Sequence, residues 1–354
     1  MQTKTKISTG QFFVILLLSR IMHVMVYRVE TFTSGTPLML GLVFSTLIES
    51  ALGIPVFVFL IKREDVLQSV MQNKKLYLAI KIILALYFTF VSGVTLLSFA
   101  RFMSEEFTFV ASPVLIIVLL ALSGAYCARL GIEGLARAGA PILWIFILLT
   151  VLMAFVNEGR YDTLNIIPVQ KNDYKMMLDY VVWDVCACRW LVLSVALARY
   201  LKHGSQKAVI GYVFVKFILI EAVLLLITMI MWTFADVPGY PILALGIYSK
   251  TDVIHRFDAF NMLVFAINCV VINGIYLNIA SDFTKKRTAL HVLVPAALAA
   301  GFAVLCYKKI ILMTVDVQNV ITFSGIVLLG VLCPLAAIIY WRVKRKCEGL
   351  PASL

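Results

Sequence analysis

Ten long apolar runs dominate the sequence and exclude most folds that are soluble in water. They cover residues 9–27, 37–61, 76–100, 111–130, 140–157, 180–200, 208–234, 257–280, 290–307 and 320–341. At about 1.5 Å per residue, each run is long enough to cross about 30 Å of hydrocarbon as an α-helix. Only 14% of the residues are charged, whereas soluble domains carry about a quarter. We therefore predict an all-α integral membrane protein, with ten transmembrane helices in a single bundle over residues 1–354.

The charged residues between the runs predict the orientation of the chain in the membrane. The net charge of +12 does not indicate a nucleic-acid-binding surface, because the basic residues lie in short clusters between apolar runs. Segments on the side of the two termini carry about twice as many Lys and Arg residues as segments on the opposite side. The positive-inside rule then predicts that both termini are cytoplasmic.

Metal and enzyme chemistry are not expected from this sequence. Cys186 and Cys188 form a C-x-C pair, but on a helix the two side chains point about 200° apart and no Cys or His partner is near in sequence. No H-E-x-x-H motif, nucleophile elbow or cluster of carboxylates is present. We predict no metal site, no cofactor and no catalytic residues.

The ten runs divide into two halves, residues 1–157 and residues 180–341, with five runs each. Since five is odd, the second half would have inverted topology, and we expect a 5+5 inverted repeat like that of amino acid transporters. Glu49 and Glu221 lie near the centres of runs two and seven, which correspond in the two halves. A carboxylate at this depth costs about 2.5–3.5 kcal/mol, so it is paired, protonated or facing water. A role for both in coupling or gating and a chance coincidence remain open.

Polar residues interrupt the first and sixth runs, where a ligand site is expected in inverted-repeat transporters. In the first run, His23 shares one helix face with Ser19 and Arg20. The first run has no Gly or Pro in its interior, which favours a continuous helix. The sixth run contains Asp184, Cys188 and Arg189. Asp184 and Arg189 are about 140° apart on an ideal helix, so each needs a partner elsewhere or the helix must unwind between them.

These residues suggest a site for a zwitterion. Arg20 or Arg189 would bind a carboxylate, and Asp184 would bind an ammonium group. The alternative is a structural salt bridge between Arg20 and Asp184 that involves no ligand.

Further polar residues in the runs are weaker candidates for the same site. Tyr87, Ser92 and Thr95 in run three are candidates to line a cavity. Asn261 and Asn268 in run eight lie seven residues apart, nearly on one stripe, and either join helices or line a cavity. Lys216 in run seven is expected to extend its side chain to the membrane interface.

Two motifs resemble those of a known family. Residues 128–139, between runs four and five, have the sequence Ala-Arg-Leu-Gly-Ile-Glu-Gly-Leu-Ala-Arg-Ala-Gly. They resemble the Arg-Gly-Leu-Glu…Ala-Arg segment of the spore germination permeases, the multi-spanning subunits of nutrient germinant receptors. In this segment Arg129 and Glu133 are one turn apart and can pair, Gly131 permits close packing, and Arg137 completes the motif.

The second motif precedes run eight. Tyr240-Pro241 and the segment 255–260, His-Arg-Phe-Asp-Ala-Phe, are similar to the Tyr-Pro and Glu-Arg-x-Asp signals of the same family. His255 replaces the acidic residue, and the tryptophan usual shortly afterwards is missing. With the length and the ten-span plan, the resemblance covers essentially the whole chain.

The resemblance implies a fold, a location and partners. It implies the amino acid–polyamine–organocation transporter fold, with a ligand between helices one, three, six and eight, in the inner membrane of a spore. It also implies two partners, a larger membrane subunit and a lipoprotein subunit. We expect a germinant-sensing subunit that binds a small nutrient, with an amino acid as the first candidate. The alternative is a proton-coupled amino-acid transporter in which Glu49 or Glu221 carries the proton.

Overall fold

The computed structural model describes residues 6–26, 35–106, 112–166, 173–202, 205–231, 239–249, 257–283, 289–312 and 314–347. Within these ranges the chain is mostly helical, with short turns and loops between the helices and an isolated bridge between Ile7 and Leu201. The α-helices are α1 (Thr9–Met25), α2 (Thr36–Ile61), α3 (Arg63–Gln72), α4 (Lys74–Glu106), α5 (Pro113–Arg129), α6 (Gly131–Val156), α7 (Tyr174–Cys186), α8 (Trp190–Leu197), α9 (Ser205–Met231), α10 (Pro241–Tyr248), α11 (Phe257–Ala280), α12 (Ala289–Tyr307), α13 (Val315–Gly325) and α14 (Cys333–Cys347). The short elements used below are the 3-10 turns η4 (Ala198–Tyr200) and η6 (Ser281–Phe283) and the π-helix η7 (Ile326–Leu332).

Eight helical segments of the described chain are long and apolar enough to cross a membrane. They are Thr36–Ile61, Lys74–Glu106, Gly131–Val156, Tyr174–Tyr200, Ser205–Ile230, Phe257–Ala280, Leu290–Tyr307 and Val317–Arg345. All eight coincide with predicted runs, so the prediction of an all-α integral membrane protein is confirmed. Helices α1 and α5 are apolar but have only 17 residues each, the lower limit for a span, and their crossing of the membrane stays a prediction.

The sixth predicted span is broken, and the first is continuous where it is described. Helix α7 ends at Cys186 and α8 begins at Trp190, so the chain leaves the helical path over Ala187–Arg189. The sequence left open whether Asp184 and Arg189 find partners elsewhere or the helix unwinds between them, and the structure shows the unwinding. Helix α1 runs from Thr9 to Met25 without interruption, as the lack of interior Gly and Pro favoured.

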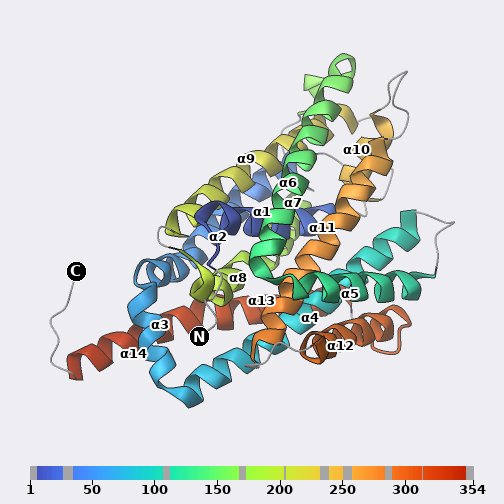
Figure 1. Cartoon of the computed structure of the whole chain (residues 1–354). Helices are drawn as coiled ribbons and strands as arrows, with labels where there is room; N and C mark the ends of the chain where they lie inside the picture. Colours follow the sequence, from blue (N-terminus) through green and yellow to red (C-terminus); the bar gives the residue numbers. More distant parts are fainter. Residues whose placement is uncertain are drawn as a thin grey trace.

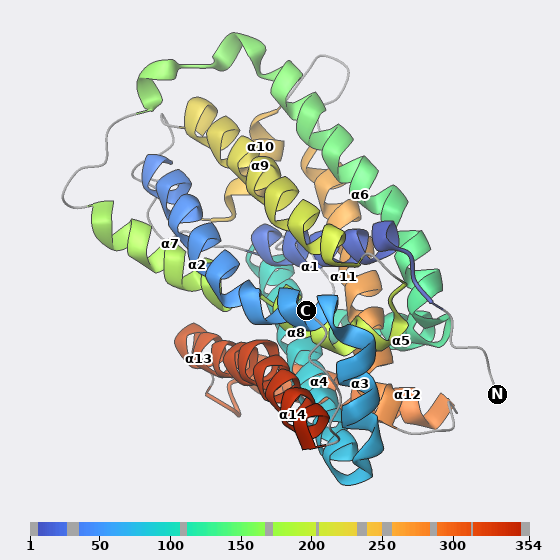
Figure 2. The ribbon, with the colours of Figure 1, turned by 90° about the vertical axis from the view of Figure 1, so that its left-hand side faces the viewer.

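A small group of helices forms the centre of the bundle. In their most apolar stretches, the spans Tyr174–Tyr200, Phe257–Ala280 and Lys74–Glu106 are 83%, 72% and 61% buried, whereas the other five are 33–39% buried. Helix α1 lies among them, packed against α6, α9 and α11 (Figures 1 and 2). Helix α2 packs against α7 and α9. The break in the sixth span is therefore enclosed by other helices.

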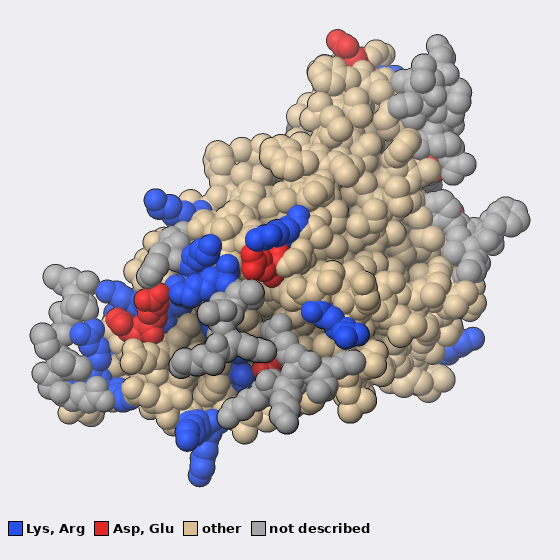
Figure 3. All heavy atoms as spheres, viewed as in Figure 1, with Lys and Arg blue, Asp and Glu red and all other residues tan. Residues whose placement is uncertain are grey.

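The outer surface fits a lipid environment. Large apolar side chains such as Leu47, Leu86, Trp144 and Phe155 are more than 60% exposed, and such contiguous apolar surface is rare on soluble monomers. In Figure 3, Lys and Arg side chains gather near α3 and the end of α14, whereas the surface over the middle of α6 and α9 is almost uncharged. The protein is a multi-pass membrane protein.

Candidate functional site

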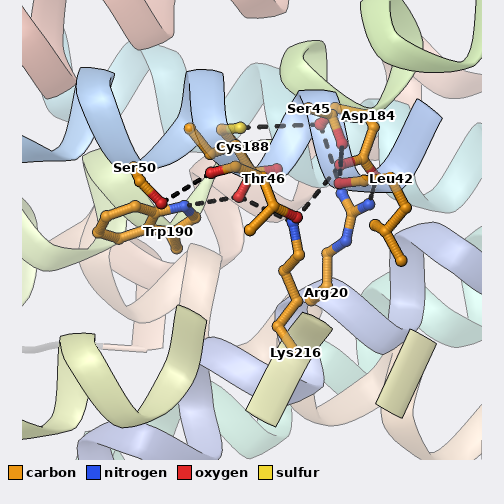
Figure 4. Close-up of polar contacts among 10 residues, drawn as sticks. Arg20, Leu42, Ser45, Thr46, Ser50, Asp184, Cys188, Trp190 and Lys216 are labelled. Carbon is orange, nitrogen blue, oxygen red and sulfur yellow. Dashed lines mark hydrogen bonds and ion pairs between the residues drawn. The ribbon is translucent and has the colours of Figure 1, made fainter. Parts of the chain in front are cut away.

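Four charged side chains from four helices meet beside the break in the sixth span, and Figure 4 labels three of them. We call them the charged cluster: Arg20 of α1, Glu49 of α2, Asp184 of α7 and Lys216 of α9. None is more than 3% exposed. The cluster contains two cations and two carboxylates, so its formal charges cancel. Pairing of this kind offsets much of the cost of burying charges.

Asp184 holds the centre of the charged cluster. Its Oδ1 forms an ion pair with the Nη2 of Arg20. The hydroxyl of Ser45 on α2 donates a hydrogen bond to its Oδ2 at 2.6 Å, and the Nζ of Lys216 lies 3.5 Å from the same oxygen. Asp184 therefore connects α7 to α1, α2 and α9 at one point.

Glu49 forms the second half of the charged cluster. Its Oε2 lies 3.0 Å from the Nζ of Lys216 and accepts a hydrogen bond from the indole Nε1 of Trp190 at 3.3 Å. Lys216 thus bridges the carboxylates of Glu49 and Asp184. Trp190 is the first residue of α8, so Glu49 contacts the far side of the helix break.

The break also makes a backbone carbonyl available to the cluster. Because α7 ends at Cys186, the carbonyl of Asp184 has no normal helical partner four residues on, since that N–H bonds to Val185 instead. This carbonyl accepts a hydrogen bond from the backbone N–H of Ala187 at 3.0 Å, and weaker ones from Arg20 at 3.5 Å and from the thiol of Cys188 at 3.7 Å. Broken transporter helices present backbone groups in the same way.

Aromatic rings cover one side of Arg20. Its guanidinium lies 5.7 Å from the ring centre of Trp183, and His23 stacks on the same indole with ring centres 4.4 Å apart. His23 therefore lies in the site through an aromatic contact rather than through a hydrogen bond to Ser19 or Arg20. Ser19 instead lies 3.4 Å from the hydroxyl of Tyr276 on α11.

Arg189 lies in the break but does not join the charged cluster. Its side chain is 5% exposed, and its Nη1 donates a hydrogen bond to the hydroxyl of Thr95 on α4 at 3.2 Å. Among the residues that the structure describes, no carboxylate pairs with it, and its Nε has no hydrogen-bond partner. Arg189 is thus a buried cation without a counter-charge in the described part of the chain.

The asparagines of α11 join helices. Asn268 donates a hydrogen bond to the carbonyl of Leu18 on α1 at 3.2 Å, and Asn261 lies 3.4 Å from the sulfur of Met153 on α6. Ser92 of α4 donates to Asn273 of α11. These contacts correspond to the helix-joining alternative for the polar residues of this span.

The ring of Tyr87 is buried against Phe88, with ring centres 5.3 Å apart, and borders Gly325.

Glu49 and Glu221, which the sequence places at matching positions, have different surroundings. Glu49 is fully buried in the charged cluster. Glu221 is partly exposed on α9, and within the described chain its Oε2 has no hydrogen-bond partner. The two carboxylates therefore do not form equivalent sites in this conformation.

The segment 128–139 forms a turn between two helices. Helix α5 ends at Arg129, and Gly131 begins α6 with a positive φ of 80°, which favours glycine. The expected pair between Arg129 and Glu133 is not formed, because this turn separates the two residues. Glu133 instead pairs with Arg137, one turn further along α6, at 2.6 Å on the surface.

Several residues of the site were missed or misjudged from the sequence. Lys216 was expected to extend to the interface, but it is fully buried between Glu49 and Asp184, so that prediction is wrong. The signal was available, because a lysine inside an apolar run must find either water or a carboxylate. Ser45 gave no signal, since hydroxyl residues are ordinary in membrane helices. Thr95, a candidate to line a cavity, instead accepts a hydrogen bond from Arg189.

The fold and site define a class of protein: a multi-pass helical membrane protein with a broken central span and a buried polar centre, as in permeases. The chain belongs to the spore germination permease family. The family model described as spore germination protein matches residues 6–310. A comparison with curated proteins gives no significant match. The family is of transporter or receptor type rather than a family of enzymes.

Proposed function

We propose that this chain is the germinant-sensing, permease-like subunit of a spore nutrient receptor, and that it binds an amino acid beside the break in the sixth span. The observation that carries the proposal is the buried guanidinium of Arg189, which has no carboxylate partner among the described residues. Burying an unpaired charge is costly, so a carboxylate from a ligand would be bound strongly there.

Asp184 would bind the ammonium group of the same ligand. Its carboxylate already accepts contacts from Arg20, Ser45 and Lys216, so an incoming ammonium group would compete with these partners. Such competition would weaken the connection of α7 to α1 and α9. If the ligand binds more tightly to the conformation in which these contacts are weakened, it shifts the population of the chain toward that conformation. Such a population shift is the signal that a receptor would pass to its partners.

The Arg20–Asp184 ion pair also fits the alternative in which these two residues form a salt bridge that involves no ligand. A purely structural role and a ligand-binding role of Asp184 predict different results for the same variant. If the pair is purely structural, removing both charges leaves ligand response intact. If Asp184 binds ligand, removing both charges abolishes the response. The variant Arg20→Gln with Asp184→Asn separates the two outcomes, with the amount of protein in the spore membrane measured as a control.

The main experiment uses spores that carry Arg189→Gln, Arg189→Lys or, as a matched control, Lys207→Gln on the exposed start of α9. Germination is measured on a mixture of the standard L-amino acids. The proposal expects loss of response with Gln, partial response with Lys and normal response in the control. Normal germination of the Arg189→Gln spores, with other receptors deleted, contradicts it.

A proton-coupled amino-acid transporter is the second candidate. It is favoured by the half-buried carboxylate of Glu221, whose Oε2 has no hydrogen-bond partner in the described chain. Uptake of amino acids into proteoliposomes that stops when the pH gradient is collapsed, and that is lost in Glu221→Gln, would support transport. Ligand binding without uptake would favour a pure sensor.

The remaining features belong to the same proposal. We propose ten spans with both termini in the cytoplasm, an inverted repeat of residues 1–157 and 180–341, and the spore inner membrane as location. The partners are a larger membrane subunit and a lipoprotein subunit. Reporter fusions at each terminus test the orientation, and the genes beside this one test the partners.

A further inference from the structure

A cavity separate from the charged cluster lies near the end of the bundle where α3, α4 and α14 lie together (Figure 2). It contains about 730 Å³ of atom-free space, including the part that opens to the surroundings. Most of its wall is apolar, with Phe59, Leu67, Val70, Ile80, Leu84 and Ala337 among the lining residues. None of the charged cluster lines it.

One part of the cavity wall is polar and basic. Arg199 of η4 forms an ion pair with Asp282 of η6 and donates a hydrogen bond to the hydroxyl of Tyr77 at 3.4 Å. The Nζ of Lys81 on α4 donates to the backbone carbonyl of Asp282 at 3.0 Å and lies 4.9 Å from the ring centre of Tyr77. The lining therefore holds two cations and one carboxylate, an excess of positive charge.

The start of α4, the helix that carries Lys81, adds to the positive charge of this end of the bundle, because it begins with Lys74 and Lys75. Lys and Arg side chains also gather over this end of the surface (Figure 3). Basic pockets between membrane helices on the cytoplasmic side attract anionic lipid head groups.

The side of the cavity formed by α14 is shaped by an irregular helix. Cys333 and Pro334 line the cavity directly after the π-helix η7. At Gly330 of η7, an added Cβ would lie 2.8 Å from the Cβ of Leu191, so this close approach fixes η7 against α8. π-Helical segments inside α-helices are often found at functional sites, and this one directly precedes the part of α14 that lines the cavity.

We propose that this cavity binds one anionic membrane phospholipid, with an acyl chain along the apolar wall and the phosphate beside Arg199 and Lys81. A lipid is the occupant that combines a long apolar chain with a negative charge and is present at high concentration among membrane helices. Val195, Ala196 and Arg199 of the lining belong to α8 and η4, so the lipid contacts the second half of the broken span. This inference does not depend on the proposed nutrient site.

Native mass spectrometry of the purified full-length protein tests the site. The probes are phosphatidylglycerol, phosphatidylcholine with the same acyl chains, and free oleate. Because Asp282 offsets Arg199, one net positive charge at about 1 kcal/mol predicts phosphatidylglycerol binding about five times tighter than phosphatidylcholine binding. By the same figure, Lys81→Gln weakens phosphatidylglycerol binding about fivefold. The bulky change Ala337→Phe fills the cavity and abolishes the preference, whereas Lys207→Gln, on the exposed start of α9, leaves it unchanged.

Three results would overturn the proposal. Equal affinity for the two phospholipids removes the role of the basic wall. Unchanged binding in Lys81→Gln places the lipid elsewhere, and this variant decides the matter if Ala337→Phe does not fold. Oleate that competes as well as phosphatidylglycerol assigns the cavity to free fatty acids instead of a phospholipid.

Discussion

Replacing Lys216 by methionine removes one of the two cations of the charged cluster. Its Nζ lies 3.0 Å from Glu49 and 3.5 Å from Asp184, and the side chain is fully buried. The Lys216→Met variant therefore keeps both carboxylates but only Arg20 to balance them. Removing one partner of a buried ion pair costs about 3–5 kcal/mol, and we expect the free energy of unfolding to fall by that amount.

A second substitution tests whether charge, rather than shape, causes this loss. Changing Glu49 to glutamine in the Lys216→Met background restores a neutral cluster, with Arg20 and Asp184 still paired. Residues in one ion-pair network show coupling energies of about 0.5–3 kcal/mol, so the double variant recovers about 1–3 kcal/mol relative to the single variant. Lys207→Met, on the exposed start of the same helix, serves as the control and stays within about 0.5 kcal/mol of the parent.

The assay is reversible denaturant unfolding in mixed micelles, followed by helical circular dichroism. All four proteins are compared under identical lipid and detergent conditions. The reasoning is refuted if Lys216→Met unfolds within about 0.5 kcal/mol of the parent. It is equally refuted if the double variant is less stable than the single one, because neutralising Glu49 would then not compensate.

Three further substitutions each alter one contact, and their free energy of unfolding is measured in the same assay. Ser45→Ala removes the 2.6 Å hydrogen bond to the Asp184 carboxylate and lowers stability by about 1.5–3 kcal/mol; no loss would show that the contact is absent. Gly53→Ala places a methyl group 2.7 Å from the indole of Trp190 and destabilises by about 1–3 kcal/mol, whereas unchanged stability would mean that the indole shifts freely. Arg137→Gln breaks only an exposed pair and costs less than about 1 kcal/mol; a larger loss would assign this residue a tertiary role.

The positions of the spans were predictable because hydrocarbon imposes a simple demand. Every backbone group in lipid must bond within its own helix, so a span needs a long apolar run, and such runs are visible without any tertiary information. For the sixth span, helix geometry left two outcomes open, because Asp184 and Arg189 cannot pair within one helix turn: either each finds a partner on another helix, or the helix unwinds between them.

The residues that make up the site were harder to predict from the sequence, because they depend on which helices are neighbours. Helix α9 is apolar all round, so its sequence does not show that Lys216 faces Glu49 of α2 rather than the interface. The pairing of Glu133 was also misjudged, since periodicity on one helix was applied across the turn at Gly131. Packing and turn geometry, rather than hydropathy, decide such partners.

The central claim, that the break in the sixth span receives an amino acid, is tested most directly by ligand-induced stabilisation of the purified protein. The melting temperature is measured with and without a mixture of the standard L-amino acids, for the parent, Arg189→Gln and Lys207→Gln. The account predicts a rise for the parent and Lys207→Gln and none for Arg189→Gln, because ligand that binds only the folded protein stabilises it. An equal rise in Arg189→Gln, or no rise in the parent, would contradict it.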